Sequence, residues 1–272
     1  MKIIIAICLL VLLLSNSCFA AWERHSAGGR SQAMGGTSAA SADLWSLSNN
    51  QAGTAFLKGF SAGISFENRF LLKELMFEQV GLALPVKAGT FGLIITRFGN
   101  GQYSELKAGF SYARKLGTRF SVGVQLDYLR IQISNEYGNK NLISCEIGLM
   151  YQADKHLTVG LQLLNPVPVK ITTYPMEHLP TLICAALAYR FSEVFTIAVE
   201  TEKDLENPIS FRAGAEYHVA KPAYARIGIS TSPVSFTFGF GLEFGKLKLD
   251  MASGYHQALG FSPSGSIIYS FK

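Results

Sequence analysis

Hydrophobic and polar residues alternate along most of the chain. In the clearest run, Ser235–Phe244, every even position holds Phe or Leu, and the odd positions hold Ser, Thr, Gly and Glu. A period of two is typical of a β-strand with one apolar face, whereas an amphipathic helix has a period of about 3.6. Similar runs occur, in chain order, at Phe60–Glu67, Leu75–Leu84, Phe91–Thr96, Leu106–Tyr112, Phe120–Tyr128, Ile143–Tyr151, Leu157–Leu163, Thr181–Tyr189, Phe195–Glu202, Ile209–Val219, Ala223–Thr231, Leu247–Met251 and Ile267–Phe271.

The runs and their connections predict a closed membrane barrel. A tilted strand of about 9–11 residues crosses a bilayer, and a sheet in lipid must close because an open edge leaves backbone groups unpaired. Short connections such as Ser192-Glu193 alternate with long ones such as Asn165–Leu179, as in outer-membrane barrels. We therefore predict an all-β fold, with residues 59–272 forming a closed antiparallel transmembrane β-barrel of about 14 strands. A soluble β-sandwich is the alternative.

One run breaks the alternation. In Phe120–Ile133 the apolar residues occupy even positions as far as Tyr128, and odd positions from Leu129 onward. A β-bulge would shift the phase by one residue. The alternative is that the strand leaves the membrane there and packs its upper part under an external loop.

The composition fits an exported membrane barrel. Charged residues are 16% of the chain, against roughly 25% in soluble domains. Residues 1–20 contain Lys2, an apolar stretch at Ile3–Leu14 and small residues ending at Ala20, which is the layout of a secretory signal peptide. We predict cleavage after Ala20. A lipoprotein signal at Cys18 is the alternative, although the residues before it lack the Leu that such signals have.

Residues 21–58 are rich in Ala, Gly, Ser and Asn and have no strand period. Gly29–Gly36 reads Gly-Arg-Ser-Gln-Ala-Met-Gly-Gly, Ala42-Asp43 follows, and Asn50–Ala55 reads Asn-Gln-Ala-Gly-Thr-Ala. These elements resemble the opening of the FadL-like outer-membrane proteins, and more closely that of their PorV/PorQ relatives. The family pattern has Pro and Leu where this chain has Gln51 and Thr54.

The resemblance implies that residues 21–58 form a plug in the lumen of the barrel. It also implies either passage of hydrophobic or amphipathic small molecules or a part in type IX protein secretion. The missing Pro puts in doubt any gating that depends on a rigid turn at Gln51. The residues of the plug motif are Gly28, Gly29, Arg30, Ser31, Met34, Gly35, Gly36, Asp43, Asn50, Ala52 and Gly53.

The alternation places charges of both signs inside the barrel, where they must be paired or hydrated. We expect salt bridges that fill the lumen and anchor the plug, and a selective lining for polar or amphipathic solutes is the alternative. Arg30 and Asp43 are expected to pair with each other or with the wall. The lumen-facing charges are Glu67, Lys107, Asp127, Glu146, Arg190, Arg212, Glu216, Arg226 and Glu243.

No pattern in the sequence indicates an enzyme. The five histidines lack the H-x-x-x-H spacing of a metal pair, and no Gly-x-Ser-x-Gly motif occurs. The basic residues form no cluster of the kind that binds nucleic acid. We expect no catalytic residue, metal, cofactor or nucleic-acid partner. Cys145 and Cys184 point to opposite faces of their strands and are expected to be unpaired.

The sequence therefore predicts an outer-membrane protein of a Gram-negative bacterium. Its expected partners are membrane lipid and either a hydrophobic small molecule or secretion-machinery proteins. Transport would require an apolar pocket beside the plug, whereas secretion would require a partner-binding rim, chiefly at Asn165–Leu179. A structural barrel that scaffolds partner proteins without transport is the competing function.

Overall fold

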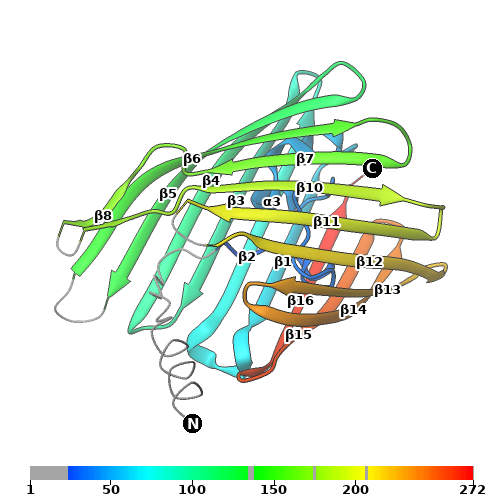
Figure 1. Cartoon of the computed structure of the whole chain (residues 1–272). Helices are drawn as coiled ribbons and strands as arrows, with labels where there is room; N and C mark the ends of the chain where they lie inside the picture. Colours follow the sequence, from blue (N-terminus) through cyan, green and yellow to red (C-terminus); the bar gives the residue numbers. More distant parts are fainter. Residues whose placement is uncertain (1–23, 134–137, 174–175, 206–207, 272) are drawn as a thin grey trace, which may run out of the picture.

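The computed structural model describes residues 24–133, 138–173, 176–205 and 208–271, so the expected cleavage site after Ala20 lies outside them. Fourteen antiparallel strands form one closed barrel (Figure 1), which confirms the predicted fold class and strand number. The pairing of β1 with β16, which sets Ser61 opposite Ser270, closes the barrel. The strands are β1 (Ser61–Asn68), β2 (Met76–Val86), β3 (Gly89–Gly99), β4 (Tyr103–Leu116), β5 (Phe120–Ile133), β6 (Gly138–Gln152), β7 (Leu157–Leu164), β10 (Leu182–Arg190), β11 (Phe195–Asp204), β12 (Ser210–Ala220), β13 (Ala223–Thr231), β14 (Val234–Phe244), β15 (Leu247–His256) and β16 (Gly260–Ser270).

The two ends of the barrel differ. At the turn end, on the right in Figure 1, tight turns join the strands. Both termini of the barrel lie there, since the backbone N–H of Phe271 donates to Phe60 O. At the loop end several connections are longer, although only Ser232 and Pro233 join β13 to β14 there. The connection between β7 and β10 contains the hairpin of β8 (Lys170–Thr173) and β9 (Met176–His178). Another loop-end connection contains the short helices η2 (Arg69–Leu71) and η3 (Lys73–Leu75).

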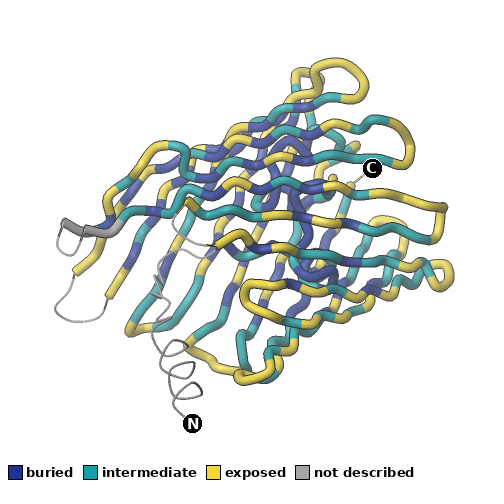
Figure 2. The backbone as a smooth tube through the Cα atoms, viewed as in Figure 1, coloured by how far each residue is buried: buried dark blue, intermediate teal, exposed yellow. Residues whose placement is uncertain are grey.

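Large apolar side chains cover the outside of the wall. On β14, Phe238 and Phe240 are 51% and 55% exposed, whereas Gly241 between them and the turn end is buried. Figure 2 shows the same alternation of exposed and buried residues along the other strands. A closed barrel with an apolar exterior and a polar interior is suited to a lipid bilayer. No helix among the described residues is long and apolar enough to span a membrane.

Replacing Phe240 with arginine is expected to destabilise the barrel by about 2–4 kcal/mol, because a charged side chain near the bilayer midplane loses its hydration. Phe244 shares this face of β14 but lies at its turn-end terminus, where the same substitution should cost about 0–1 kcal/mol. Urea unfolding of both variants in lipid vesicles measures the difference. Equal losses would contradict the assignment of β14 to a bilayer-crossing strand.

The phase break in β5 has its cause in the loop that covers it. The pairing of β5 with β4 and β6 is continuous from Phe120 to Ile133, so the expected bulge is wrong. Leu129 and Ile131 face the interior at the loop end, where a loop takes the place of water. They are buried in one apolar cluster with Leu142, Ile171 and Leu179. This agrees with the alternative that the upper part of the strand packs under a loop.

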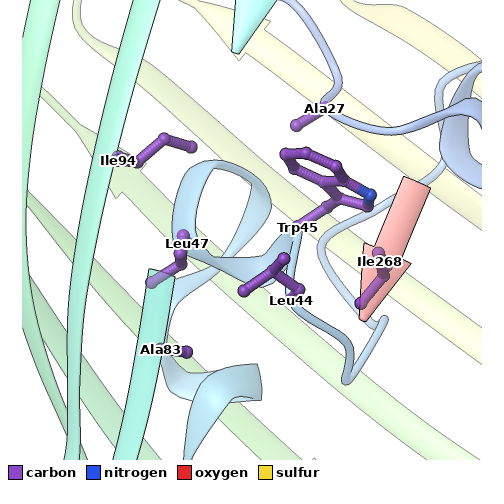
Figure 3. Packing of buried hydrophobic residues seen from close by; sticks show 7 residues of the cluster. All are labelled: Ala27, Leu44, Trp45, Leu47, Ala83, Ile94 and Ile268. Carbon is purple, nitrogen blue, oxygen red and sulfur yellow. The ribbon is translucent and has the colours of Figure 1, made fainter. Parts of the chain in front are cut away.

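Residues 24–57, called here the N-terminal segment, lie inside the barrel. They form α2 (Gly29–Ala33), α3 (Ser46–Asn49) and η1 (Gln51–Phe56). α2 contacts β13–β16 and η1 contacts β3–β6, so the segment reaches both sides of the lumen. Apolar residues of the segment and the wall pack around Trp45 (Figure 3): Ala27, Leu44, Leu47, Ala83, Ile94 and Ile268.

Candidate functional site

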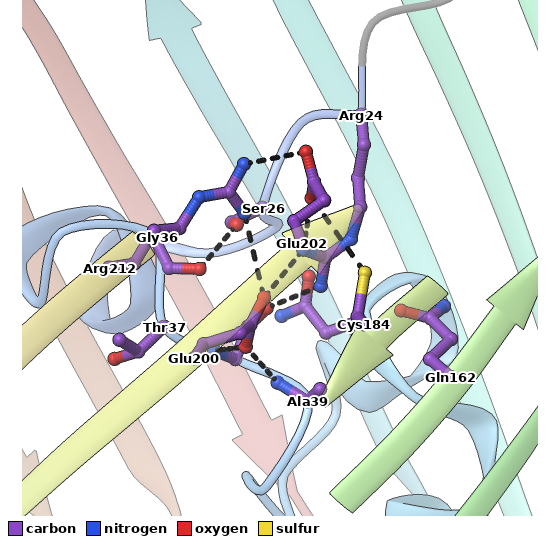
Figure 4. Close-up of polar contacts among 12 residues, drawn as sticks. Arg24, Ser26, Gly36, Thr37, Ala39, Gln162, Cys184, Glu200, Glu202 and Arg212 are labelled. Atoms are coloured by element: carbon purple, nitrogen blue, oxygen red, sulfur yellow. Dashed lines mark hydrogen bonds and ion pairs between the residues drawn. The ribbon is translucent and has the colours of Figure 1, made fainter. Parts of the chain in front are cut away.

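A buried ionic network joins the start of the segment to β11 (Figure 4). The Arg24 guanidinium donates hydrogen bonds to Glu200 at 2.6 Å and to Glu202 at 2.9 Å. Glu200 also accepts the backbone N–H groups of Ser38 and Ala39, both at 2.8 Å. One wall carboxylate thus binds the segment at two places that are distant along the chain.

A second network forms around Arg30 on α2. Its guanidinium donates two hydrogen bonds to Glu216, at 2.8 and 2.9 Å, and lies 4.0 Å from Asp43. Arg226 donates to the same Glu216 at 2.7 Å and to Asp250 at 2.6 Å. Glu216 raises the pKa of the Arg30 guanidinium above its ordinary value, although burial opposes this. A cation with a raised pKa stabilises the fold at every pH below the pKa of an arginine in the unfolded chain. This anchor therefore holds throughout the physiological pH range.

The third anchor uses the residue that departs from the family pattern. Gln51 Nε2 donates to Glu146 on β6 at 2.6 Å. Glu146 also accepts hydrogen bonds from Lys107 and, at 3.1 Å, from Gln162. The Lys107 ammonium lies 3.8 Å from Asp127. Gln51 therefore ties η1 to a polar cluster that a proline could not join through its side chain.

The glycines of the plug motif are required by close packing. Gly28 has a φ of 85°, and a Cβ atom there would overlap the indole of Trp45. Gly35 has a φ of 72°, and its N–H donates to Thr237 Oγ1 at 2.8 Å. A side chain at either position would strain the backbone and push the segment away from its neighbours.

Asn50 connects three parts of the site. Its side-chain amide donates to the carbonyl oxygens of Ala39 at 2.6 Å and Leu149 at 3.0 Å, and its Oδ1 accepts the N–H of Ala52 at 3.2 Å. The amide therefore fixes η1 against β6 and against the middle of the segment. Of the other motif residues, Gly29, Ser31, Met34 and Gly53 are buried, and Gly36 is half-buried.

Glycines of the wall face the segment at many points around the barrel. A Cβ atom on Gly214 would lie 2.5 Å from Met34 O, and one on Gly123 would lie 2.5 Å from Ala52 N. The wall is thus shaped to accept the segment, which accounts for many of the 26 glycines. Similar overlaps with the segment would arise at Gly63, Gly92, Gly148, Gly160, Gly228 and Gly239.

Two cavities lie on either side of the segment. The one toward the loop end has a volume of about 70 Å³ and is lined partly by Phe77, Phe98 and His25. The ring of His25 lies 4.5 Å from that of Phe77 and 5.7 Å from that of Phe98. The cavity toward the turn end, about 310 Å³, is much more polar. Its charged lining includes Arg30, Asp43, Glu216, Arg226, Glu243, Lys248 and Asp250.

The barrel fold is similar to those of solved hydrocarbon channels. The CymD monoaromatic hydrocarbon channel superposes with a TM-score of 0.75 at 15% identity, over 92% of this chain and 99% of that chain. The chain has the fold of a FadL-like barrel. A FadL homologue of Pseudomonas aeruginosa gives 0.72 at 12% identity, over 91% and 99%, and the toluene transporter TodX of P. putida gives 0.68 at 14%, over 92% and 99%. No family model matches the sequence, and no curated protein does.

The inward charges of this FadL-like barrel lie where the alternation predicts them, on the inner side of the wall. Glu67 accepts a hydrogen bond from Gln32 of the segment at 2.9 Å, and Arg212 binds Glu202 at 3.0 Å. Arg190 is exposed at the turn end, where it lines the larger cavity. The structure thus brings the predicted charges into separate groups and not into one continuous lining.

The FadL-like barrel has one central site residue that the sequence did not indicate. Arg24 precedes the glycine motif and belongs to no alternating run, so neither signal includes it. Cys184 lies beside this network on the inner face, whereas Cys145 is on the outer face, and both thiols are free as expected. Cys184, Glu200 and Glu202 are close enough together to hold a metal ion, but the Arg24 guanidinium already occupies both carboxylates.

Gly160→Ala is expected to displace the segment from β7, because the new Cβ atom would overlap the carbonyl oxygen of Ala39. Overpacking of this kind costs roughly 1–3 kcal/mol, and the displaced segment should be trimmed faster by added protease. Gly254→Ala is the matched control, since its Cβ atom would meet only a methyl group of Thr237 at 3.7 Å. Equal trimming rates in the two variants would show that the fit at Gly160 does not hold the segment.

Proposed function

We propose that the protein is an outer-membrane channel for hydrophobic small molecules, in which the N-terminal segment is the plug. The observation that carries this proposal is the cavity toward the loop end, between the segment and the wall. Concave sites of mainly apolar and aromatic lining with a few polar groups are typical of small-molecule binding. Its apolar lining consists of Phe77, Phe98, Leu129, Leu164, Leu179 and Leu182, and charged residues that also line it are Arg24, Glu105, Lys107, Asp127 and Glu146.

The size of this cavity points to a compact ligand and to movement of the segment. A dry protein cavity of about 150 Å³ holds benzene, whereas this one has about 70 Å³. A bound aromatic ring therefore requires the lining to shift. Arg24 and His25 of the segment form part of that lining, so binding of an apolar molecule would act directly on the anchor between Arg24 and Glu200.

The proposed location follows from the surface and the connections of the barrel. An apolar band of strand residues faces lipid, and short turns face the periplasm in outer-membrane barrels. The turn end is then periplasmic and the loop end external. In this proposal residues 1–20 are the signal peptide, residues 21–58 the plug and residues 59–272 the barrel.

The loop between β7 and β10 favours transport over a role in type IX secretion. A secretion accessory would need a free rim at Asn165–Leu179 to bind its partners. Ile171 and Leu179 of that loop are instead buried on Leu129 and Ile131 of the wall. Leu179 also lines the cavity toward the loop end, so the loop covers part of that cavity.

Binding of toluene to the purified protein tests the proposal. Thr96 lines the apolar cavity and Thr158 lines the polar one, so Thr96→Phe and Thr158→Phe add the same bulk to either side of the segment. Toluene should raise the thermal midpoint of the wild type and of Thr158→Phe in a saturable manner, and should not shift Thr96→Phe. Absence of saturable stabilisation in the wild type would favour a scaffold barrel without transport.

A further inference from the structure

The turn end of the barrel carries an exposed ring of basic residues, called here the collar. Cationic side chains stand in the tight turns and at the strand termini beside them, where the exposed acidic residues are Asp154 and Glu193. Glu243 and Lys248 also lie near this end, and they pair with each other at 3.1 Å. The collar consists of Lys58, Lys87, Arg114, Lys115, Arg119, Lys155, Arg190, Lys221 and Lys246, all of them exposed. Figure 2 shows the exposed turns at that end of the strands.

The net positive charge of the collar is larger than that of the complete chain. Nine basic and two acidic residues give it a net charge of about +7 at neutral pH, whereas the complete chain has +5. All other residues together therefore carry a net negative charge. The basic excess is concentrated at one end of the barrel, which a random distribution of surface charge would not produce.

The collar cations outnumber their acidic neighbours, of which Asp154 lies near Arg119. None of the nine makes an ion pair with another residue of the described ranges, whereas the loop-end Arg69 and Arg97 lie 3.5 and 3.8 Å from glutamates. Asp154 is held by its own turn, since the backbone N–H groups of Leu157 and His156 lower the pKa of its carboxyl. Mutual repulsion of unpaired cations disfavours such a ring unless anions from outside neutralise it.

Exposed aromatic residues fix the level of the collar relative to a bilayer. Tyr189 and Phe191 flank Arg190 directly, and they are 43% and 57% exposed. Phe244 precedes Lys246 by two residues, and Phe60 follows Lys58 by two. Aromatic girdles of barrels mark the interface between acyl chains and headgroups. The collar cations just beyond this girdle that line no cavity, such as Lys87, Arg114, Lys221 and Lys246, are therefore at the depth of lipid phosphates. Lys155 and Arg190 instead line the turn-end cavity, and Lys115 lies over the ring of Phe56.

We propose that the collar binds the anionic headgroups of phospholipids in the periplasmic leaflet of the outer membrane. The inference rests on the location given under the proposed function and is independent of what the channel carries. Basic residues beside a membrane-spanning segment attract anionic lipid through charge, and this attraction weakens within a Debye length. Bound lipid would neutralise the collar and fix the depth of the barrel, which keeps the turn-end cavity open to the periplasm.

Lipid selectivity of the reconstituted protein tests the collar. The probes are spin-labelled phosphatidylglycerol and spin-labelled phosphatidylcholine in phosphatidylcholine bilayers, and the readout is their relative affinity for the protein surface. The collar variant combines Lys87→Gln, Arg114→Gln, Lys221→Gln and Lys246→Gln, none of which lines a described cavity. The matched control combines Lys73→Gln, Arg97→Gln, Lys140→Gln and Lys170→Gln at the loop end.

The wild type and the control should prefer phosphatidylglycerol by about threefold or more, and the collar variant should approach a ratio of one. Raising the salt concentration should reduce the preference of the wild type. A ratio near one in the wild type, or an equal loss in both variants, would overturn the proposal. Cosedimentation with purified peptidoglycan that only the collar variant loses would assign the collar to the cell wall instead. Failure to insert into bilayers at all would overturn the membrane location itself.

Discussion

Deleting residues 28–48 is expected to convert a barrel that conducts little into an ion channel. These residues contain α2 and most of α3, which contact the wall on opposite sides of the lumen. Side chains alone can fill a barrel of about eight strands, whereas wider barrels of about sixteen strands leave an aqueous channel. A fourteen-stranded wall without this segment should therefore leak, with conductance raised on the order of tenfold or more. Planar-bilayer recording of both forms measures the change.

The wall should remain folded after this deletion, because the carboxylates that it exposes, such as Glu216, would be hydrated in the open lumen. Faster migration of the unboiled protein in a gel, relative to the boiled protein, reports the closed barrel. The intact segment should also resist added protease, since most of its residues are buried. Equal conductance of the two forms, with rapid trimming of the intact segment, would show that the segment does not close the barrel.

The alternation of side chains was sufficient to predict the wall. A one-residue error in register would expose every inward polar group to lipid, so the sequence of a strand such as β14 specifies both its faces and its partners. The same rule explains why the phase break in β5 left two interpretations open, a bulge or packing under a loop. Leu129 and Ile131 are apolar and inward because a loop distant in the sequence covers them. The alternation of side chains indicates whether a position faces polar or apolar surroundings. It does not indicate whether lipid or another part of the protein forms those surroundings.

The contacts of the segment could not be predicted in the same way. Its short helices have no apolar period, and the position of the segment depends on wall residues that are distant in the sequence, as in the hydrogen bond from Arg24 to Glu200. The resemblance indicated which residues belong to the motif. It treated Gln51 as a departure from the pattern, whereas the structure shows that Gln51 binds Glu146. Single charged residues in a segment without regular strands produce no periodic pattern. Their partners in the wall are therefore visible only in the folded structure.

Arg24→Met is expected to destabilise the protein by about 3–5 kcal/mol, because it removes the cation from a buried carboxylate. The side chains of Arg24 and Glu200 are only 3% and 0% exposed. Glu200 would keep its hydrogen bonds from Ser38 and Ala39, but it would lose its closest positive charge. The free energy of unfolding from urea titration in lipid vesicles measures the loss.

Two further variants separate the buried charge from the rest of the side chain. Arg97→Met makes the same substitution in the exposed pair with Glu78, whose side chains are 59% and 53% exposed, and should cost about 0–1 kcal/mol. Adding Glu200→Gln to Arg24→Met should recover part of the stability, because the buried carboxylate, then left with only Arg212 at 3.5 Å, is replaced by a neutral amide. If the double variant were less stable than Arg24→Met alone, the main source of the effect would be the methylene groups of Arg24 and the hydrogen bond that its guanidinium donates to Ser38 Oγ at 2.9 Å. The anchor would then depend on packing and on a neutral hydrogen-bond partner. A ligand in the neighbouring cavity could not release the segment by disturbing an ion pair.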